Sequence, residues 1–308
     1  MTAAIEVGAL TMSYAERRVL DGIDLEVREG EVFCLLGPNG AGKTTTVEIL
    51  EGFRRRTGGT VSVLGLDPQA QPTRLRERIG IVLQECGFPR QARVAELIDS
   101  WRAYYRNPRE LEELLKVVEL TQDRDMQVRR LSGGQRRRLD LALALAGDPD
   151  LIFLDEPTTG FDPESRRRTW AAIENLRALG KTVLLTTHYL DEAERLADRV
   201  AILAGGRIQV AGTVRDVARQ AGVKTKIKFT ATERVRVAAP LTRPSLDLVV
   251  SGDAAVCRTD NPAAALRELL NWAAANGLGD LDDLSVETPT LEDAYLQLVT
   301  CPSSRIPH

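Results

Sequence analysis

Two short stretches of this chain carry residue types that bind and activate phosphate groups. Residues 37–44 read GPNGAGKT, which fits the pattern GxxxxGK[ST] and lies between an apolar stretch and a helical one. Glycines there let successive backbone N–H groups surround a β-phosphate, Lys43 supplies a compact charge, and Thr44 offers a hydroxyl to Mg²⁺. Lys43 is also the only lysine among the first 115 residues. These residues therefore fit a phosphate-binding loop better than a plain glycine-rich turn. Its candidate nucleotide-binding residues are Gly37, Pro38, Asn39, Gly40, Ala41, Gly42, Lys43, Thr44 and Thr45.

The second stretch is acidic. Residues 151–157 read LIFLDEP, an apolar strand that ends in two carboxylates. Acids at the end of a buried strand cost desolvation free energy unless a cation meets them, so a surface turn is the weaker interpretation. Asp155 would orient a Mg²⁺ shell, and Glu156 could polarise an attacking water molecule.

A second phosphate-shaped loop occurs at residues 131–135, which read LSGGQ. A Ser-Gly-Gly turn that opens a helix can hold an anion through its hydroxyl, its N–H groups and the helix dipole. The chain thus has two loops suited to phosphate but only one acidic strand.

These motifs, together with Gln84, Asp162 and His188, resemble those of ABC ATPases in order and approximate spacing, over about residues 4–215. The resemblance implies ATP and Mg²⁺ as ligands, ATP hydrolysis, and two cassettes packed head to tail. In that arrangement the second loop of one chain closes over ATP that the other chain's phosphate loop holds. A second copy of this chain would then present its ATP to Ser132, Gly133, Gly134 and Gln135.

The resemblance also implies roles for single residues. Gln84 would contact Mg²⁺ and the lytic water, and His188 would contact the γ-phosphate. Asp162 would lie in the loop that couples the two sites, and Tyr14 would stack on adenine. Without the resemblance, Gln84 is a polar residue at a strand end, His188 a core histidine and Tyr14 a packing residue. The predicted catalytic residues are Glu156, His188 and Gln84, and the predicted metal ligands are Thr44, Gln84 and Asp155.

Strands and helices alternate along most of the chain, which predicts an α/β fold with a mainly parallel sheet and crossover helices. Periodicity predicts strands at 5–14, 22–30, 31–37, 61–65, 76–84, 150–157, 181–188, 199–208, 226–237, 246–252 and 254–259. It predicts helices at 44–53, 94–105, 110–120, 163–180, 191–199, 261–277 and 290–299. The resemblance adds that this is a P-loop NTPase fold of ABC type, with an N-terminal antiparallel β subdomain and a helical subdomain.

The pattern of residues along the chain changes after Gly222. We expect a cassette at 1–222 with a helical subdomain at about 86–135, a small α+β accessory or dimerisation domain at 223–300, and a disordered tail at 301–308. Asn261 and Pro262 mark the start of a helix in the small domain, and Gly277 marks its end. The acidic run DLDD at 280–283 is read as a solvated turn rather than a metal site.

Composition narrows the function further. A net charge of −3 gives no sign of a nucleic-acid surface, and the four cysteines form no CxxC pair that would suggest zinc or a disulfide framework. No stretch approaches 18 consecutive apolar residues, so a membrane role requires a partner.

The stretches 187–203, 212–217 and 288–298 resemble the daunorubicin-resistance type of ABC-2 exporter ATPases. This implies an energy-coupling subunit that sits on the cytoplasmic face of the cell membrane through a separately encoded permease and moves a drug, antibiotic or lipid-like compound. An importer ATPase remains an alternative. A soluble ABC ATPase of DNA repair is disfavoured, because only 89 positions separate Lys43 from Ser132, without heptads or paired cysteines. A translation factor with two cassettes is disfavoured because the chain holds one.

Overall fold

The computed structural model describes residues 2–82, 87, 89–238 and 246–300. Contacts divide the chain into two compact units, Met1–Val214 and Arg215–His308. From the sequence we placed the boundary at 222. The contacts divide the chain earlier, before most of a short helix, α8 (Val214–Gln220), for which the sequence analysis made no prediction.

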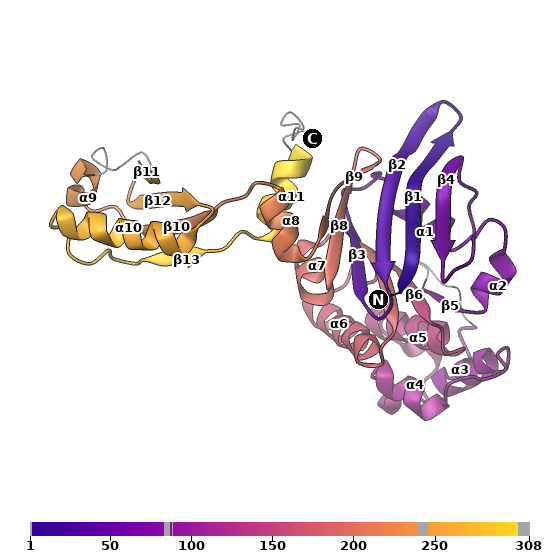
Figure 1. Ribbon diagram of the computed structural model, residues 1–308. Coiled ribbons are helices and arrows are strands. Elements are labelled where there is room, and N and C mark those ends of the chain that lie inside the picture. The colour runs from indigo at the N-terminus through magenta and orange to yellow at the C-terminus, as the bar shows by residue number, and fades with distance from the viewer. Residues whose placement is uncertain (1, 83–86, 88, 239–245, 301–308) are drawn as a thin grey trace. The chain divides into compact units, whose positions relative to one another are not determined.

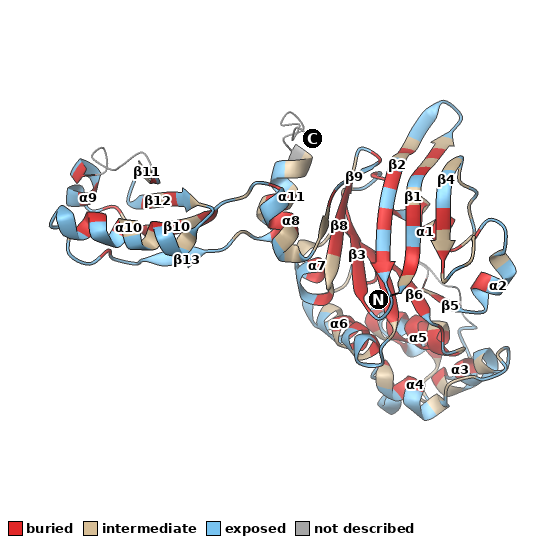
Figure 2. Ribbon diagram, viewed as in Figure 1, coloured by how far each residue is buried: buried red, intermediate tan, exposed pale blue. Residues whose placement is uncertain are grey.

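An antiparallel sheet forms the N-terminal part of the first unit. Its strands are β1 (Ala3–Tyr14), β2 (Arg17–Arg28) and β4 (Gly58–Val63), in the order β2-β1-β4. The strand β2 alternates buried and exposed residues, as Figure 2 shows, because one face of the sheet packs on the core and the other meets water. The expected antiparallel β subdomain is confirmed.

A six-stranded sheet forms the centre of the unit, and it is parallel apart from its last strand. Its strands, in spatial order, are β5 (Ile79–Val82), β6 (Leu151–Asp155), β7 (Thr182–Thr187), β3 (Val32–Leu36), β8 (Arg199–Ala204) and β9 (Arg207–Gly212). The strands β3 and β7 are buried along their whole length, as their continuous apolar runs predict. The strand expected at 199–208 is instead two strands, because Gly205 and Gly206 both adopt positive φ and turn the chain into a hairpin.

Helices surround this sheet (Figure 1). They are α1 (Lys43–Leu50), α2 (Pro72–Arg76), α3 (Val94–Arg102), α4 (Leu111–Val117), α5 (Gly133–Leu145), α6 (Pro163–Ala178) and α7 (Leu190–Leu196), with 3₁₀ turns at Thr121–Asp123 and Val128–Arg130. Helices α3 and α4 lie beyond α5 and form the helical subdomain that the sequence predicts.

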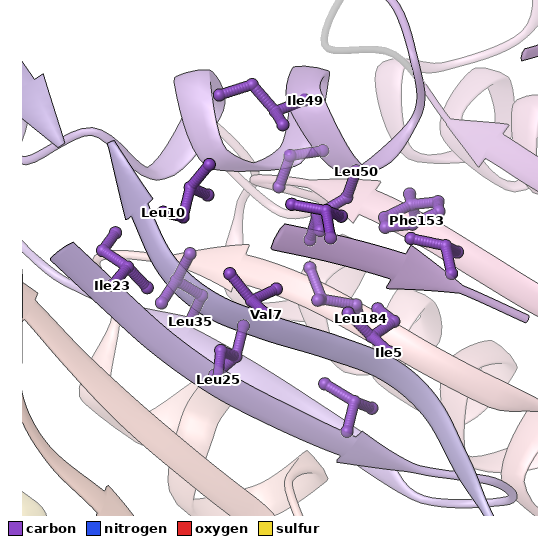
Figure 3. Packing of buried hydrophobic residues seen from close by; sticks show 14 of the residues in the cluster. Ile5, Val7, Leu10, Ile23, Leu25, Leu35, Ile49, Leu50, Phe153 and Leu184 are labelled. Carbon is purple, nitrogen blue, oxygen red and sulfur yellow. The ribbon is translucent and has the colours of Figure 1, made fainter. Parts of the chain in front are cut away.

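The main core joins the two sheets across α1. Figure 3 shows Leu10 of β1 and Ile23 of β2 on one side, Leu50 of α1 between, and Phe153 of β6 beyond it. All four side chains have no exposed surface. Burying each side chain of this size stabilises the fold by about 1.5–3 kcal/mol. The helix that follows the phosphate loop is therefore held by packing on both sheets.

The second unit is an α+β domain. Its sheet has the order β11-β12-β10-β13 and is antiparallel. Its elements are α8, β10 (Thr225–Thr230), α9 (Glu233–Ala238), β11 (Asp247–Ser251), β12 (Ala254–Thr259), α10 (Pro262–Ala275), β13 (Ser285–Glu287) and α11 (Leu291–Thr300). The Asn261 side chain accepts a hydrogen bond from the N–H of Ala264, and Gly277 follows α10 with φ +64°. Asn261 therefore caps the start of α10 and Gly277 ends it, as the sequence predicts.

One expected strand is wrong in its second half. We predicted a strand over 226–237, but the strand ends at Thr230 and residues 233–238 are helical. Alternation of valine with charged residues suggested the strand. The same residues place Val235 and Ala238 three positions apart, and both are buried on one side of α9. The tail at 301–308 lies outside the described residues.

Candidate nucleotide-binding site

The phosphate loop connects the end of β3 to the first residue of α1. Gly40 and Gly42 adopt φ of +77° and +108°, a region that favours glycine. A Cβ at Gly42 would also lie 2.5 Å from the Leu20 Cδ2 atom, and one at Gly37 would lie 2.3 Å from the Leu203 carbonyl oxygen. Close packing and backbone conformation therefore both require glycine at position 42, whereas backbone conformation favours it at 40 and close packing requires it at 37.

A cavity of about 600 Å³ lies over this loop. From the phosphate loop it is lined by Asn39, Gly40, Gly42, Lys43, Thr44 and Thr45, from the acidic strand by Asp155 and Glu156, and from the β1–β2 hairpin by Tyr14, Arg17 and Val19. Gly37, Pro38 and Ala41 belong to the loop but do not line the cavity. The cavity brings together two motifs that are more than one hundred residues apart in the chain.

Lys43 is buried at the base of the cavity, with 5% of its surface exposed. Its Nζ donates to the carbonyl oxygens of Gly37 at 2.9 Å and Pro38 at 3.3 Å, and lies 3.4 Å from Glu156 Oε1. The ammonium group is thus fixed where the loop N–H groups gather. An anion bound to the loop would meet a positive charge already held in place.

Glu156 follows β6 with φ +45°, an uncommon conformation for a residue with a side chain. Its N–H donates to the backbone oxygen of Thr186 at 3.2 Å and to the Thr186 hydroxyl at 3.1 Å, which holds the turn. Its carboxylate accepts from the Thr159 hydroxyl at 3.1 Å and lies 3.4 Å from His188 Nδ1. Burial alone would raise the pKa of Glu156, but Lys43, Thr159 and His188 together hold it below its usual value. Glu156 is therefore ionised at neutral pH.

Asp155 lies between the phosphate loop and β7. Its Oδ2 accepts from the Thr44 hydroxyl at 3.4 Å, and its Oδ1 accepts from the Thr186 hydroxyl at 2.5 Å. Octahedral Mg²⁺ holds oxygen ligands at about 2.1 Å, which separates neighbouring ligands by about 3 Å. The Thr44 and Asp155 oxygens are therefore close enough to share one ion after a small adjustment.

Tyr14 ends β1 at the rim of the cavity and is 40% exposed. The Arg54 guanidinium lies over its ring at 5.1 Å. Arg17 is the direct cross-strand partner of Tyr14, so both side chains project from one face of the hairpin. The hairpin thus adds an aromatic ring and a cation to the wall of the cavity.

The LSGGQ loop does not line this cavity. Ser132 is the N-cap of α5: its hydroxyl accepts from the Gln135 N–H at 3.2 Å, and the Gln135 side chain accepts from the Ser132 N–H at 2.8 Å. Ser132 and Gly133 are exposed, whereas Gly134 is buried against Ser165 near the start of α6. The loop therefore presents a capped helix N-terminus to solvent.

The remaining predicted residues lie around these two loops. Asp162 is the N-cap of α6 and accepts from the N–H groups of Glu164 and Ser165, each at 3.0 Å. His188 follows β7 and contacts Glu156, as given above. Gln84 lies outside the described residues.

Sequence reasoning missed several residues of the site, and three of them show why. Arg17 could have been found as the residue opposite Tyr14 in a tight hairpin. Thr186 braces both acids from β7, and its only signal was a hydroxyl within a buried apolar strand. Arg137 donates to the Asp155 carbonyl oxygen at 2.8 Å, a contact that no local pattern indicates.

Across the part of the chain that the structure describes, no three side chains of His, Cys, Asp or Glu are grouped so that they could hold a metal ion. In the acidic run, Asp283 accepts from the Thr230 hydroxyl at 2.8 Å. No described helix is long and apolar enough to cross a membrane.

This fold and this cavity define a P-loop nucleoside triphosphatase. Residues 20–159 match the family model described as ABC transporter. The chain is 36% identical over 308 residues to the daunorubicin resistance ATP-binding protein of Streptomyces coeruleorubidus, covering 96% of this chain and 94% of that protein. It is 35% identical over 302 residues to the Nod factor export ATP-binding protein I of Rhizobium meliloti, covering 96% and 88%.

Among solved structures, a dimeric ATP-binding cassette in a post-hydrolysis state with ADP and Pi is 26% identical. It matches with a TM-score of 0.60 and covers 68% of this chain and 99% of that one. The chain therefore belongs to the ABC transporter family. It is the ATP-binding, ATP-hydrolysing subunit of a transporter.

Proposed function

We propose that this chain is the energy-coupling ATPase of an exporter, and that two copies share two composite ATP sites. In each site one chain supplies the phosphate loop and the acidic strand, and the other supplies the LSGGQ loop. ATP binding closes the pair, hydrolysis reopens it, and a separately encoded membrane permease follows this motion. The chain would sit at the cytoplasmic face of the membrane through that permease.

The observation that carries this proposal is the position of the LSGGQ loop. Ser132 and Gly133 begin a 13-residue helix, are exposed, and are absent from the cavity that holds Lys43 and Glu156. The N–H groups and dipole of a helix N-terminus favour an anion by about 0.3–1 kcal/mol or more. A second chain packed head to tail would bring its phosphates to this helix. Solved relatives described as dimeric cassettes are consistent with such pairing.

The chain's own residues divide the chemistry as follows. Lys43 and the loop N–H groups would bind the β- and γ-phosphates, and Tyr14 would stack on adenine. Thr44 and Asp155 would hold Mg²⁺, which supplies charge neutralisation at the phosphates. Glu156, ionised and aimed into the cavity, would orient water and accept its proton, with His188 beside it. Gln84 is proposed as a further contact to Mg²⁺ and water, and Asp162 as part of the link between the two sites.

The names of similar proteins favour export over import. Proteins similar over nearly the whole chain, including the second unit, are named for daunorubicin resistance and for Nod factor export. We propose a drug, antibiotic or lipid-like hydrophobic compound as cargo. Among its described residues, the second unit holds no group of three His, Cys, Asp or Glu side chains that could bind a metal ion. We propose that this unit stabilises the dimer or its contact with the permease. An importer subunit is the alternative, and transport direction in vesicles separates the two.

The test combines turnover with association. Glu156→Gln should bind ATP and lower the rate of hydrolysis by at least 100-fold, because an amide cannot accept the proton. It should also form a dimer on size exclusion when ATP and Mg²⁺ are present, and Ser132→Arg in the same chain should abolish that dimer. Hydrolysis at the wild-type rate would remove Glu156 from its role.

A further inference from the structure

One buried acid in the first unit has no part in the roles proposed above. Glu192 lies in α7 and has no exposed surface. An isolated carboxylate buried in this way is unfavourable unless donors meet it. Burial raises the pKa of Glu192, against the opposing effect of the hydroxyl and indole donors around it. Such a group persists in a fold when its hydrogen bonds hold something in place.

Glu192 joins three segments through one oxygen atom. The Thr158 hydroxyl donates to Glu192 Oε1 at 2.8 Å, and the Trp170 indole N–H donates to the same atom at 3.0 Å. Thr158 has no exposed surface, and Trp170 is 8% exposed. The three side chains therefore form a buried cluster that joins α7, α6 and the loop after β6.

Each member of this cluster belongs to a segment of the ATPase site. Thr158 is two residues beyond Glu156, and Glu192 is four residues beyond His188. Trp170 lies in α6, whose N-cap is Asp162. The cluster thus ties the loop of the acid to the segment of the histidine, whose Nδ1 lies 3.4 Å from Glu156 Oε1.

A second connection between the same elements lies nearer the surface. The Tyr189 ring packs against His188 with centroids 4.1 Å apart and a tilt of 39°, and the Arg166 guanidinium of α6 lies 4.5 Å from the centre of the Tyr189 ring. Arg166 also bonds Asp191 of α7 at 3.2 Å. Both connections join the His188 segment to α6, so α6 provides the surface against which His188 is oriented.

We propose that Glu192 is a positioning residue that fixes His188 relative to Glu156, by holding α7 against Thr158 and Trp170. This rests on the proposed roles of Glu156 and His188 in hydrolysis. Glu192 is buried and does not line the cavity over the phosphate loop. Its removal changes the geometry of the hydrolytic pair and leaves the phosphate loop unchanged.

The experiment measures kcat and KM for ATP in full-length variants. Glu192→Ala should lower kcat by 10-fold or more with KM within about twofold, because ground-state binding does not use α7. Glu192→Gln keeps an acceptor for both donors and should restore kcat to within about threefold of the wild type. Thr158→Val removes only the hydroxyl and should also lower kcat. This variant replaces Glu192→Ala in the test if Glu192→Ala does not fold.

Two comparisons separate positioning from a loss of stability. Leu196→Ala removes buried apolar contacts from the same helix, since Leu196 is 2% exposed. It should lower the melting temperature without a matching loss of kcat at 25 °C; an equal loss of kcat at equal destabilisation overturns the proposal. His188→Ala should cost much less in a Glu192→Ala background than in the wild type. Independent, multiplicative losses would also overturn it.

Failure of the proposed function gives a different result. If Glu156→Gln hydrolyses ATP normally, the ATPase roles are wrong. If Glu156→Gln is inactive but Glu192→Ala is normal in kcat, the ATPase roles stand and only the positioning role of Glu192 is wrong.

Discussion

Lys43 and Glu156 are in contact, with Lys43 Nζ 3.4 Å from Glu156 Oε1. The cation expected to meet the phosphates is thus paired with the acid expected to activate water. We expect the phosphates of ATP to compete with this acid for Lys43. Removing the acid's charge should therefore favour binding by about 1 kcal/mol, or roughly fivefold in Kd.

A matched pair of variants tests this contact by isothermal titration with ATP. Ser132→Arg alone and Ser132→Arg with Glu156→Gln both stay monomeric in our account, so association does not contribute to the measured Kd. Tighter binding in the second protein is the expected result. Equal affinities would mean that the Lys43–Glu156 pair does not compete with phosphate.

Arg17 is a cation of the cavity wall and lies opposite Tyr14 on the hairpin. We expect Arg17→Gln to weaken ATP binding about threefold to tenfold and to reduce its dependence on salt, because one charge near the nucleotide is lost. Arg18 is the matched control: it is the next residue on the strand and bonds Asp21 at 2.7 Å. Arg18→Gln should leave the Kd for ATP unchanged, and equal effects from both would exclude a specific role for Arg17.

Glu51, at the end of α1, should make stability depend on pH. It is 4% exposed, and burial first, then Asp155 and Glu48, raises its pKa from 4.5 to about 8. The folded state then binds more protons than the unfolded state between these values, so this group's contribution to stability falls as pH rises from 4.5 to 8.

The substitution Glu51→Gln removes the ionisable group, so the unfolding free energy should no longer fall for this reason as pH rises. Its unfolding free energy, measured by urea titration without nucleotide, should exceed that of the wild type by about 2–4 kcal/mol at pH 8 and by little at pH 4. A difference that does not change with pH would show that Glu51 titrates normally.

Much of the site was predictable because its motifs are continuous in sequence. The phosphate loop needs glycines, Lys43 and Thr44 within eight residues, and LIFLDEP places two acids at one strand end. Pairing across the sheet was not predictable in the same way. Thr186 reaches Asp155 only because β7 lies beside β6 in a particular register, and nothing local in the sequence specifies that register.

The helices and strands of the second unit were harder to predict from the sequence. Residues 233–237 read ERVRV, and alternation there suits a strand as well as one face of a short helix. Packing decided for the helix, because Val235 and Ala238 cover the same core as Leu269 and Trp272. The end of α10 was predictable, since Gly277 supplies a conformation that few other residues adopt readily.

The two-unit division gives a prediction for truncation. A chain that ends at Val214 keeps every described residue of the nucleotide cavity and should fold and bind ATP. If the second unit stabilises the pair, this chain should need a higher protein concentration for ATPase activity. Loss of ATP binding in a folded truncated chain would contradict the division, and unchanged dimerisation and transport would contradict the proposed role of the second unit.

The central claim is that two chains share each ATP site, and counting the ATP that mixed dimers retain after rapid removal of free nucleotide tests it most directly. Both chains carry Glu156→Gln to stop turnover, one also carries Lys43→Ala, and the other carries Ser132→Arg. Different affinity tags isolate the mixed pair in ATP and Mg²⁺. One composite site then collects both defects and the other is intact, so we predict one retained ATP per mixed dimer. The Ser132→Arg, Glu156→Gln chain alone binds ATP reversibly at its phosphate loop and should retain none. If each chain used its own LSGGQ loop, no intact site would remain and no ATP would be retained. Retention of no ATP by the mixed pair, while Glu156→Gln alone dimerises and retains ATP, would contradict the account.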